Sequence, residues 1–414
     1  QRWRTQRAGS DPCEGARSTA SIGPIPKPTP IPCQRRGIFF ARCVTSIALS
    51  ADHPSLLRII LKTKKKRMLF ILNKLVKSRR TASALVLAIG ALLGACSGPE
   101  TTSQIGVYSG RHYNTDKDLY ERFTEATGIQ VKLLEAKDDA LIERLNTEGD
   151  DSPADVLILA DVARLDRAAG MNLFQTVDSD ALNQAVPRDL RDSEGRWFGL
   201  TRRLRAPMFN ADRVNAEQVS SYGALADPSL KGKLCLRNRR SVYNQSLVAF
   251  MLDEQGQAAT EDWIKGMVNN LAEPVFSSDT PMIRAVAQGQ CGVALANSYY
   301  LGRMQAGDKG EADRTLSGKV TVRWPDPVHV NITGGGVTRA SRNPEAAQRL
   351  LEFLSSDQAQ GGYAAANHEY PLKGIGEDPV LQAWGPFNQA KVSAERLGEL
   401  NAQALELMAA NGWQ

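Results

Sequence analysis

Histidine is scarce in this chain, with four residues among 414, and no serine lies in the Gly-x-Ser-x-Gly pattern of a nucleophile elbow. One of the four, His53, belongs to the basic leader described below. The remaining side chains form no recognisable set of nucleophile, base and acid. The sequence therefore favours binding over catalysis, and we expect no enzyme activity.

Acidic residues are few at the N-terminal end, where residues 1–96 hold 18 Lys and Arg but only 3 Asp and Glu. The rest of the chain has 33 basic and 42 acidic residues, so its net charge is near −9 although the whole chain carries +6. The basic pI near 9.0 thus comes from the leader. Nucleic-acid binding gains no support, because it needs basic charge on the folded part of the chain.

The segment 68–96 has the order of a signal peptide: Met68, four basic residues within 74–80, and an apolar run over 82–95. The run is too short to span a bilayer as a stable helix. It ends in Leu-Gly-Ala before Cys96, which resembles a bacterial lipoprotein signal and predicts that Cys96 is lipidated. Ordinary signal-peptidase cleavage near Ala95 is the alternative. Residues 1–67, with their proline-spaced stretch, are expected to be upstream sequence outside the native protein, or else a disordered extension.

Two of the six cysteines, Cys235 and Cys291, lie outside the leader. An exported pair favours a disulfide. Closing the 56-residue separation would stabilise the fold by roughly 4 kcal/mol in the chain-entropy model. Two buried free thiols are the alternative, and two cysteines alone make a poor zinc site.

Short apolar strands alternate with amphipathic helices from Gln104 onward. The first series has expected strands over 105–108, 129–134 and 155–159, with helices near 116–126 and 141–145. The second has strands over 233–237 and 293–296 and helices over 242–252 and 260–270. This order predicts α/β architecture with a parallel or mixed sheet covered on both faces. Chain length predicts two domains.

Two longer strand-like segments, 197–210 and 329–339, are expected to cross between the two domains. The second contains a run of three glycines, Gly334 to Gly336, which lacks the lysine context of a phosphate-binding loop. We expect a hinge or tight turn there, since glycine tolerates positive φ.

Tyrosine is also infrequent, with nine residues, and four of them follow expected strands in the same way. Each site has a strand, a loop and the first turn of a helix, and together they hold Arg111, His112, Tyr113, Tyr243, Tyr299 and Tyr300. Open α/β sheets place ligands beyond strand C-terminal ends, where helix N-termini favour negative groups such as phenolate. Singly, each residue is also explained as a solvated loop histidine or a packed tyrosine.

Clustered phenolates point to one class of ligand. Phenolate is a hard anionic oxygen donor and suits Fe³⁺ far better than it suits a soft ion. Three or more phenolates would balance a trivalent charge. Because the pKa of free tyrosine is about 10, the metal must displace those protons, so affinity should fall in acid.

Three segments carry a resemblance to a known family: residues 108–116 (YSGRHYNTD), 197–205 (WFGLTRRLR) and 297–300 (NSYY). Together they resemble the bacterial ferric-iron ABC-transporter binding proteins, most of all the cyanobacterial FutA-type branch. The resemblance covers the chain from about Gln104 to the C-terminus. Its tandem tyrosine with an upstream His-Tyr pair is the specific part.

The resemblance implies a periplasmic binding protein of the two-lobed Venus-flytrap type, class II, with two crossing hinge segments. Such a protein closes on Fe(3+) and delivers it to an inner-membrane ABC permease. The implied iron ligands are His112, Tyr113, Tyr243, Tyr299 and Tyr300, with Arg111 and Arg203 beside them. The expected partners are this permease and ferric iron, with no nucleic acid.

The implied domain division places residues 104–200 and about 337–374 in lobe 1, residues 201–336 in lobe 2, and residues 375–414 in a C-terminal helical segment. We expect a periplasmic monomer, anchored to the membrane if Cys96 is lipidated. A flytrap protein for an organic solute such as a polyamine or a sugar is the alternative. Such pockets usually offer carboxylates or aromatic stacking faces rather than clustered phenolates.

Overall fold

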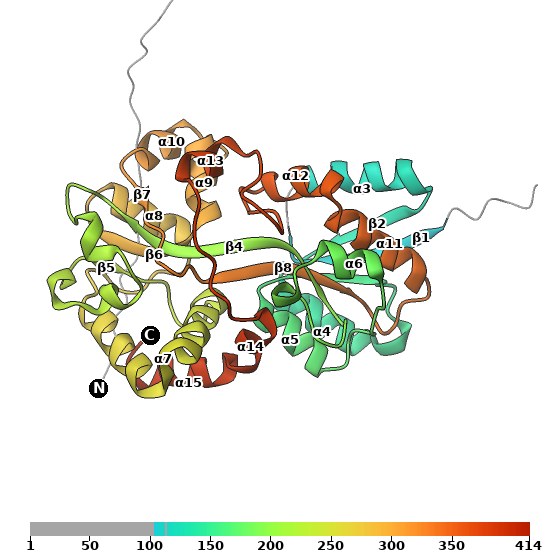
Figure 1. Cartoon of the computed structure of the whole chain (residues 1–414), viewed down its shortest axis with the longest axis horizontal. Coiled ribbons are helices and arrows are strands. Elements are labelled where there is room, and N and C mark those ends of the chain that lie inside the picture. Colours follow the sequence, from blue (N-terminus) through green and yellow to red (C-terminus); the bar gives the residue numbers. More distant parts are fainter. Residues whose placement is uncertain (1–102, 112–113) are drawn as a thin grey trace, which may run out of the picture. The chain divides into compact units, whose positions relative to one another are not determined.

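The computed structural model describes residues 103–111 and 114–414 (Figure 1). The expectations for residues 1–96, including the signal peptide and Cys96, therefore lie outside the described residues. Within the described part, no helix has both the length and the apolar character needed to cross a membrane.

The first part of the sheet is parallel, as its apolar strands predict. Strand β1 (Gln104–Ser109) lies between β2 (Gln130–Glu135) and β3 (Val156–Ala160) and pairs in parallel with both. Every residue of β3 is buried, which explains its continuous apolar sequence. Helices α3 (Asn114–Thr127), α4 (Asp138–Glu148) and α5 (Val162–Gly170) connect or follow these strands.

Two long strands carry the sheet onward (Figure 1). β8 (Val330–Val337) pairs antiparallel with β3 and with the first half of β4 (Phe198–Phe209). The second half of β4 pairs antiparallel with β6 (Val293–Asn297). The order β2-β1-β3-β8-β4-β6-β5 makes a mixed sheet in which β4 is shared by both parts. The sequence predicted both long strands.

Two short strands complete the sheet. β7 (Thr321–Val322) pairs with β4, and β5 (Leu234–Cys235) pairs in parallel with β6. β5 is shorter than the predicted 233–237. A disulfide joins Cys235 to Cys291, whose Cα atoms are 5.9 Å apart, and both residues are buried.

The glycine run lies inside β8 and forms no turn, so of the predicted alternatives, a hinge or a tight turn, the tight turn is wrong. These glycines serve close packing instead of positive φ. A Cβ on Gly334 would lie 2.6 Å from Leu165 Cδ1, and one on Gly336 would lie 2.2 Å from the carbonyl oxygen of Arg196. Both neighbours approach the strand because it has no side chain there.

The helices of the second part include the two predicted over 242–252 and 260–270, which form one element, α7 (Val242–Asn269). It is interrupted at Gly256, where φ is 76° and ψ is 175°. Helices α8 (Asp279–Ala287), α9 (Ser298–Ala306) and α10 (Glu311–Ser317) follow.

The chain then returns to the first part and ends beside α7. The helices of this last segment are α11 (Pro344–Ser355), α12 (Asp357–Ala365), α13 (Pro379–Trp384), α14 (Ala394–Glu399) and α15 (Asn401–Ala410), whereas α6 (Asp180–Ala185) lies between α5 and β4. α14 packs against α5 and α7, and α15 packs against α7 (Figure 1). Trp413 is buried and its Nε1 donates to the carbonyl oxygen of Arg237 over 2.8 Å. The C-terminal segment is thus docked onto the fold.

Candidate metal centre

Three of the predicted ligands lie in the first turns of helices. Tyr243 is the second residue of α7, while Tyr299 and Tyr300 are the second and third residues of α9, which begins directly after β6. The ring centroids of Tyr299 and Tyr300 are 4.3 Å apart. Tyr299 is buried and the other two are half-buried. Both helix N-termini favour negative charge on the phenol oxygens.

Two arginines lie against these rings. The guanidinium carbon of Arg203, on β4, is 4.6 Å from the ring centroid of Tyr299 and 5.1 Å from that of Tyr243. Arg237 lies 5.4 Å from the ring of Tyr243. Their positive charges favour the ionised phenols. The family resemblance implied that Arg203 lies near the tyrosines, and the structure places its guanidinium against the rings of Tyr243 and Tyr299.

Burial opposes ionisation at Tyr300. It raises the pKa of this phenol above 10, with further contributions from Tyr243 and Asp279, while a hydrogen bond with Tyr299 and the charge of Arg237 act in the other direction. Without a bound cation, Tyr300 is therefore protonated at neutral pH. A metal ion that uses this oxygen must displace its proton.

Arg205 fixes the two helix starts that carry the tyrosines. Its Nη2 donates to Asn244 Oδ1 on α7 over 2.6 Å, and its Nη1 donates to Asn297 Oδ1, just before α9, over 2.9 Å. Nη1 also contacts Asp279 Oδ2 on α8 at 3.0 Å. This buried arginine therefore holds α7, α8 and α9 in register from the strand β4. Sequence reasoning did not single it out.

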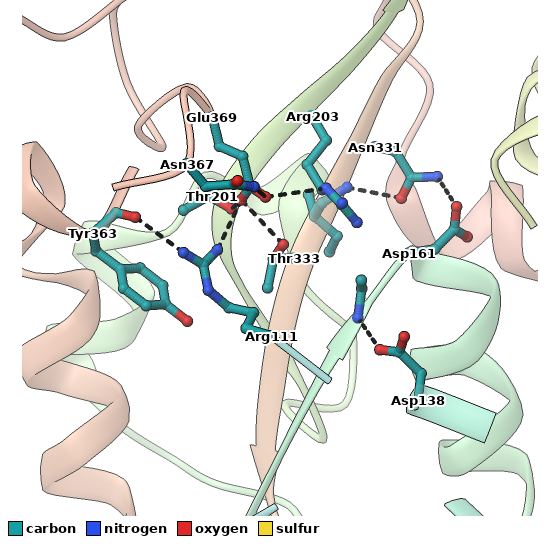
Figure 2. A network of polar contacts seen from close by, with 12 residues as sticks. Arg111, Asp138, Asp161, Thr201, Arg203, Asn331, Thr333, Tyr363, Asn367 and Glu369 are labelled. Atoms are coloured by element: carbon teal, nitrogen blue, oxygen red, sulfur yellow. Dashed lines mark hydrogen bonds and ion pairs between the residues drawn. The ribbon is translucent and has the colours of Figure 1, made fainter. Parts of the chain in front are cut away.

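The predicted ligands His112 and Tyr113 lie outside the described residues, but Arg111 directly before them is buried and fixed. Its Nε and Nη2 donate to the two carboxylate oxygens of Asp116 over 2.7 and 3.0 Å. Nη1 donates to Glu369 Oε2 over 2.9 Å, and the guanidinium lies 4.1 Å from the ring of Tyr363 (Figure 2). The structure thus anchors the chain directly before the predicted pair His112 and Tyr113.

Asp161 is a site residue that the sequence analysis missed. It follows β3, is fully buried and has a φ of 90°. Its carboxylate accepts from Ser246 Oγ and from Asn331 Nδ2, each over 2.7 Å. Burial raises its pKa to about 6, although the hydrogen bond from Ser246 acts in the opposite direction. Its place directly after a strand was the available clue, shared with the tyrosine sites.

Seven of the nearby residues surround a gap too narrow to hold a water molecule: Asp161, Arg203, Arg205, Tyr243, Asn297, His329 and Asn331. His329 is buried, and burial together with Arg205 lowers its pKa to about 3, so its imidazole is neutral. Its Nδ1 has no hydrogen-bond partner within the described part of the chain.

The donor set of the site decides which metal it fits. Among residues 103–111 and 114–414, no group of three or more His, Cys, Asp or Glu side chains is placed to hold a metal ion. The oxygen donors that the structure brings together here are the phenols of Tyr243, Tyr299 and Tyr300, which are anionic when ionised. Such hard anionic donors suit Fe³⁺ rather than a soft ion.

Comparison with known proteins gives the family context. Residues 151–391 match the family described as bacterial extracellular solute-binding protein. The chain is 41% identical over 321 residues to iron uptake protein A1 of a Synechocystis species, covering 76% of this chain and 89% of that protein. It is 28% identical over 335 residues to the Fe(3+)-binding periplasmic protein of Serratia marcescens, covering 80% of this chain and 95% of that one.

A solved structure shows the same architecture. It is the Trichodesmium protein IdiA, or FutA, in complex with iron and citrate ligands, with 41% sequence identity and a TM-score of 0.73. The match covers 75% of this chain and 100% of that one. The two-lobed α/β fold predicted from the sequence is thereby confirmed.

Proposed function

This chain belongs to the family of bacterial extracellular solute-binding proteins, and from this premise we propose that it binds ferric iron outside the cytoplasm through tyrosinate ligands. Membership of a binding and transport family agrees with the absence of a catalytic set in the sequence. The relatives named above are an iron uptake protein and an Fe(3+)-binding periplasmic protein. These names support the choice of ferric iron over an organic solute.

The observation that carries the proposal is the convergence of Tyr243, Tyr299 and Tyr300 around Arg203 and Arg237. Three phenolates would balance the charge of Fe³⁺. Two neighbouring cations lower the cost of ionising the phenols. A pocket for a cationic polyamine would instead need acidic groups, and two arginines there would repel it.

We propose further that His112 and Tyr113, which follow β1 in the chain, complete the ligand set. In this arrangement lobe 1 comprises residues 104–200 and about 337–374, and lobe 2 comprises residues 201–336. Iron would then lie between tyrosines of both lobes, and closure would shield it from water. The closed protein would deliver its cargo, as a periplasmic monomer, to an ABC permease in the inner membrane.

The test is ferric binding by the purified protein, measured by metal analysis and by the visible band of tyrosinate-to-iron charge transfer. The Tyr299→Phe/Tyr300→Phe double variant keeps both rings but removes their donor oxygens. We expect it to lose the colour and most of the affinity while the melting temperature of the apo-protein barely changes. Tyr243→Phe should act likewise, and His112→Ala should cost less because imidazole brings no charge.

Tyr108→Phe is the matched control. The hydroxyl of Tyr108 donates to Glu148 Oε2 over 2.9 Å, away from the tyrosine cluster. This variant loses a phenol oxygen as well but should keep both colour and affinity. Full iron binding by the Tyr299→Phe/Tyr300→Phe variant would refute the proposed function.

A further inference from the structure

Glu369 lies at the centre of the polar network in Figure 2. It follows α12 in the chain and is 1% exposed. Its Oε2 accepts hydrogen bonds from Thr201 Oγ1 on β4 and from Thr333 Oγ1 on β8, the latter over 3.2 Å. Its Oε1 accepts from Asn367 Nδ2 over 2.8 Å. A carboxylate this deeply buried is retained only where its charge is matched.

Two arginines balance the negative charge of Glu369. Arg111 Nη1 is 2.9 Å from Glu369 Oε2, and Arg203 Nε is 3.4 Å from Oε1. Burial would raise the pKa of Glu369, but the charges of Arg111 and Arg203, with the hydrogen bonds it accepts, lower it below its usual value. Glu369 is therefore ionised and bridges the two cations.

The two arginines belong to different parts of the proposed iron site. Arg111 directly precedes His112 and Tyr113, whereas Arg203 lies on the rings of Tyr243 and Tyr299. One carboxylate thus contacts both cations. Glu369 also partly neutralises the positive charge that Arg203 presents to the phenols.

We propose that Glu369 is a positioning residue of the ferric site. It holds Arg203 against the tyrosine rings and limits how much positive charge the tyrosinates experience, while its ion pair with Arg111 ties it to the end of β1. This inference rests on the proposed ferric function. It assigns to the segment after α12 a part in setting the affinity and colour of the iron complex.

Glu369→Gln tests the role because it removes the charge and nearly keeps the size. Without the negative charge of Glu369, the full positive charge of Arg203 acts on the neighbouring phenolates. The phenolate electrons are then lower in energy. The charge-transfer band should move to shorter wavelength. Ferric affinity, measured by competition with a chelator, should fall roughly 10- to 100-fold, as for other residues that orient metal ligands.

Asp192→Asn is the matched control. Asp192 is also a buried carboxylate, and it accepts from Arg196 Nε over 2.9 Å and Nη2 over 2.7 Å in a loop away from the tyrosines. This variant should lower the melting temperature but leave the band and the affinity unchanged. A purely structural Glu369 would give the same pattern.

The outcomes separate the two claims. If the wild-type protein binds no ferric iron, the proposed function fails. If the wild type binds iron and folded Glu369→Gln shows the same band and affinity, only the role of Glu369 is overturned. Should Glu369→Gln not fold, Glu369→Asp decides, since it keeps the charge but withdraws it by one methylene: a shifted band supports the role and an unshifted band overturns it.

Discussion

Ser246 Oγ on α7 donates a hydrogen bond to Oδ1 of Asp161, which follows β3, over a distance of 2.7 Å. The same carboxylate accepts from Asn331 on β8. One buried carboxylate therefore links α7, the end of β3 and β8. In the proposed lobe division, Ser246 belongs to lobe 2 and Asp161 to lobe 1.

Ser246→Ala should destabilise the apo-protein by about 1–3 kcal/mol, because a buried carboxylate then loses one of its hydrogen-bond donors. The free energy of unfolding from urea titration measures this. Ser220→Ala is the control, since the hydroxyl of Ser220 donates only to the carbonyl of Glu217 in an exposed turn. Its effect should stay within about 0.5 kcal/mol. Equal losses in the two variants would contradict the prediction.

Local patterns predicted most of the strands and helices because burial and periodicity are properties of contiguous residues. They also placed Tyr243 and Tyr299, since each lies at a helix start after a strand. Glu369 could not be found in this way: it contacts Arg111, 258 residues away in the chain. No local pattern marks a carboxylate whose partners come from other elements.

The role of the glycine run also could not be predicted from local sequence. The run at Gly334 has the composition of a turn, yet it forms the middle of β8, where neighbouring groups such as Leu165 approach too closely for a Cβ. A sequence shows where glycine occurs. It does not show whether the position requires a positive φ or lacks room for a Cβ. The short β5 likewise depends on pairing with β6, which its own residues do not reveal.

The disulfide between Cys235 and Cys291 should be a main source of stability. In the chain-entropy model, closing a loop of 56 residues contributes roughly 4 kcal/mol. Thiol counting under denaturing, non-reducing conditions should find neither cysteine free. A reductant should lower the melting temperature of the wild type and leave that of a Cys235→Ala/Cys291→Ala variant unchanged. Two titratable thiols in the wild type would show that no bridge forms.

The mature protein should begin at or near Cys96, because the apolar run over 82–95 ends in a lipoprotein-like sequence. Intact-mass measurement on protein extracted from bacterial membranes checks this. Cys96→Ser should release the protein from the membrane if the cysteine is lipidated and should change nothing if an ordinary peptidase cleaves near Ala95. A mass that retains residues 1–67 would contradict both forms of processing.

His368 should make stability depend on pH. Its Nδ1 is 2.6 Å from Asp378 Oδ2, and its Nε2 is 3.5 Å from Asp308 Oδ2. Burial alone would lower the pKa of this imidazole, but the two carboxylates outweigh burial and raise it above 6.5. The folded state therefore holds the proton more tightly than the unfolded chain, whose histidine pKa is about 6.5.

The proton on His368 stabilises the folded state, because the folded state binds it more tightly than the unfolded chain does. The stabilisation from His368 is fully present below about pH 6.5 and is lost as the pH rises through the raised folded pKa. His368→Asn is a suitable variant, because His368 has a φ of 53° and asparagine tolerates that region. The free energy of unfolding of wild type minus variant, measured from about pH 5 to pH 9, should be largest in acid and shrink toward base.

His329 should give stability the opposite dependence on pH. Its pKa is lowered to about 3, so its neutral form is favoured and stability is lost as the pH falls below the unfolded pKa near 6.5. The free energy of unfolding of the wild type minus that of His329→Asn should therefore decrease toward acid. The corresponding difference for His368→Asn should increase toward acid. Parallel pH profiles for the two variants would show that the carboxylates do not hold a proton on His368.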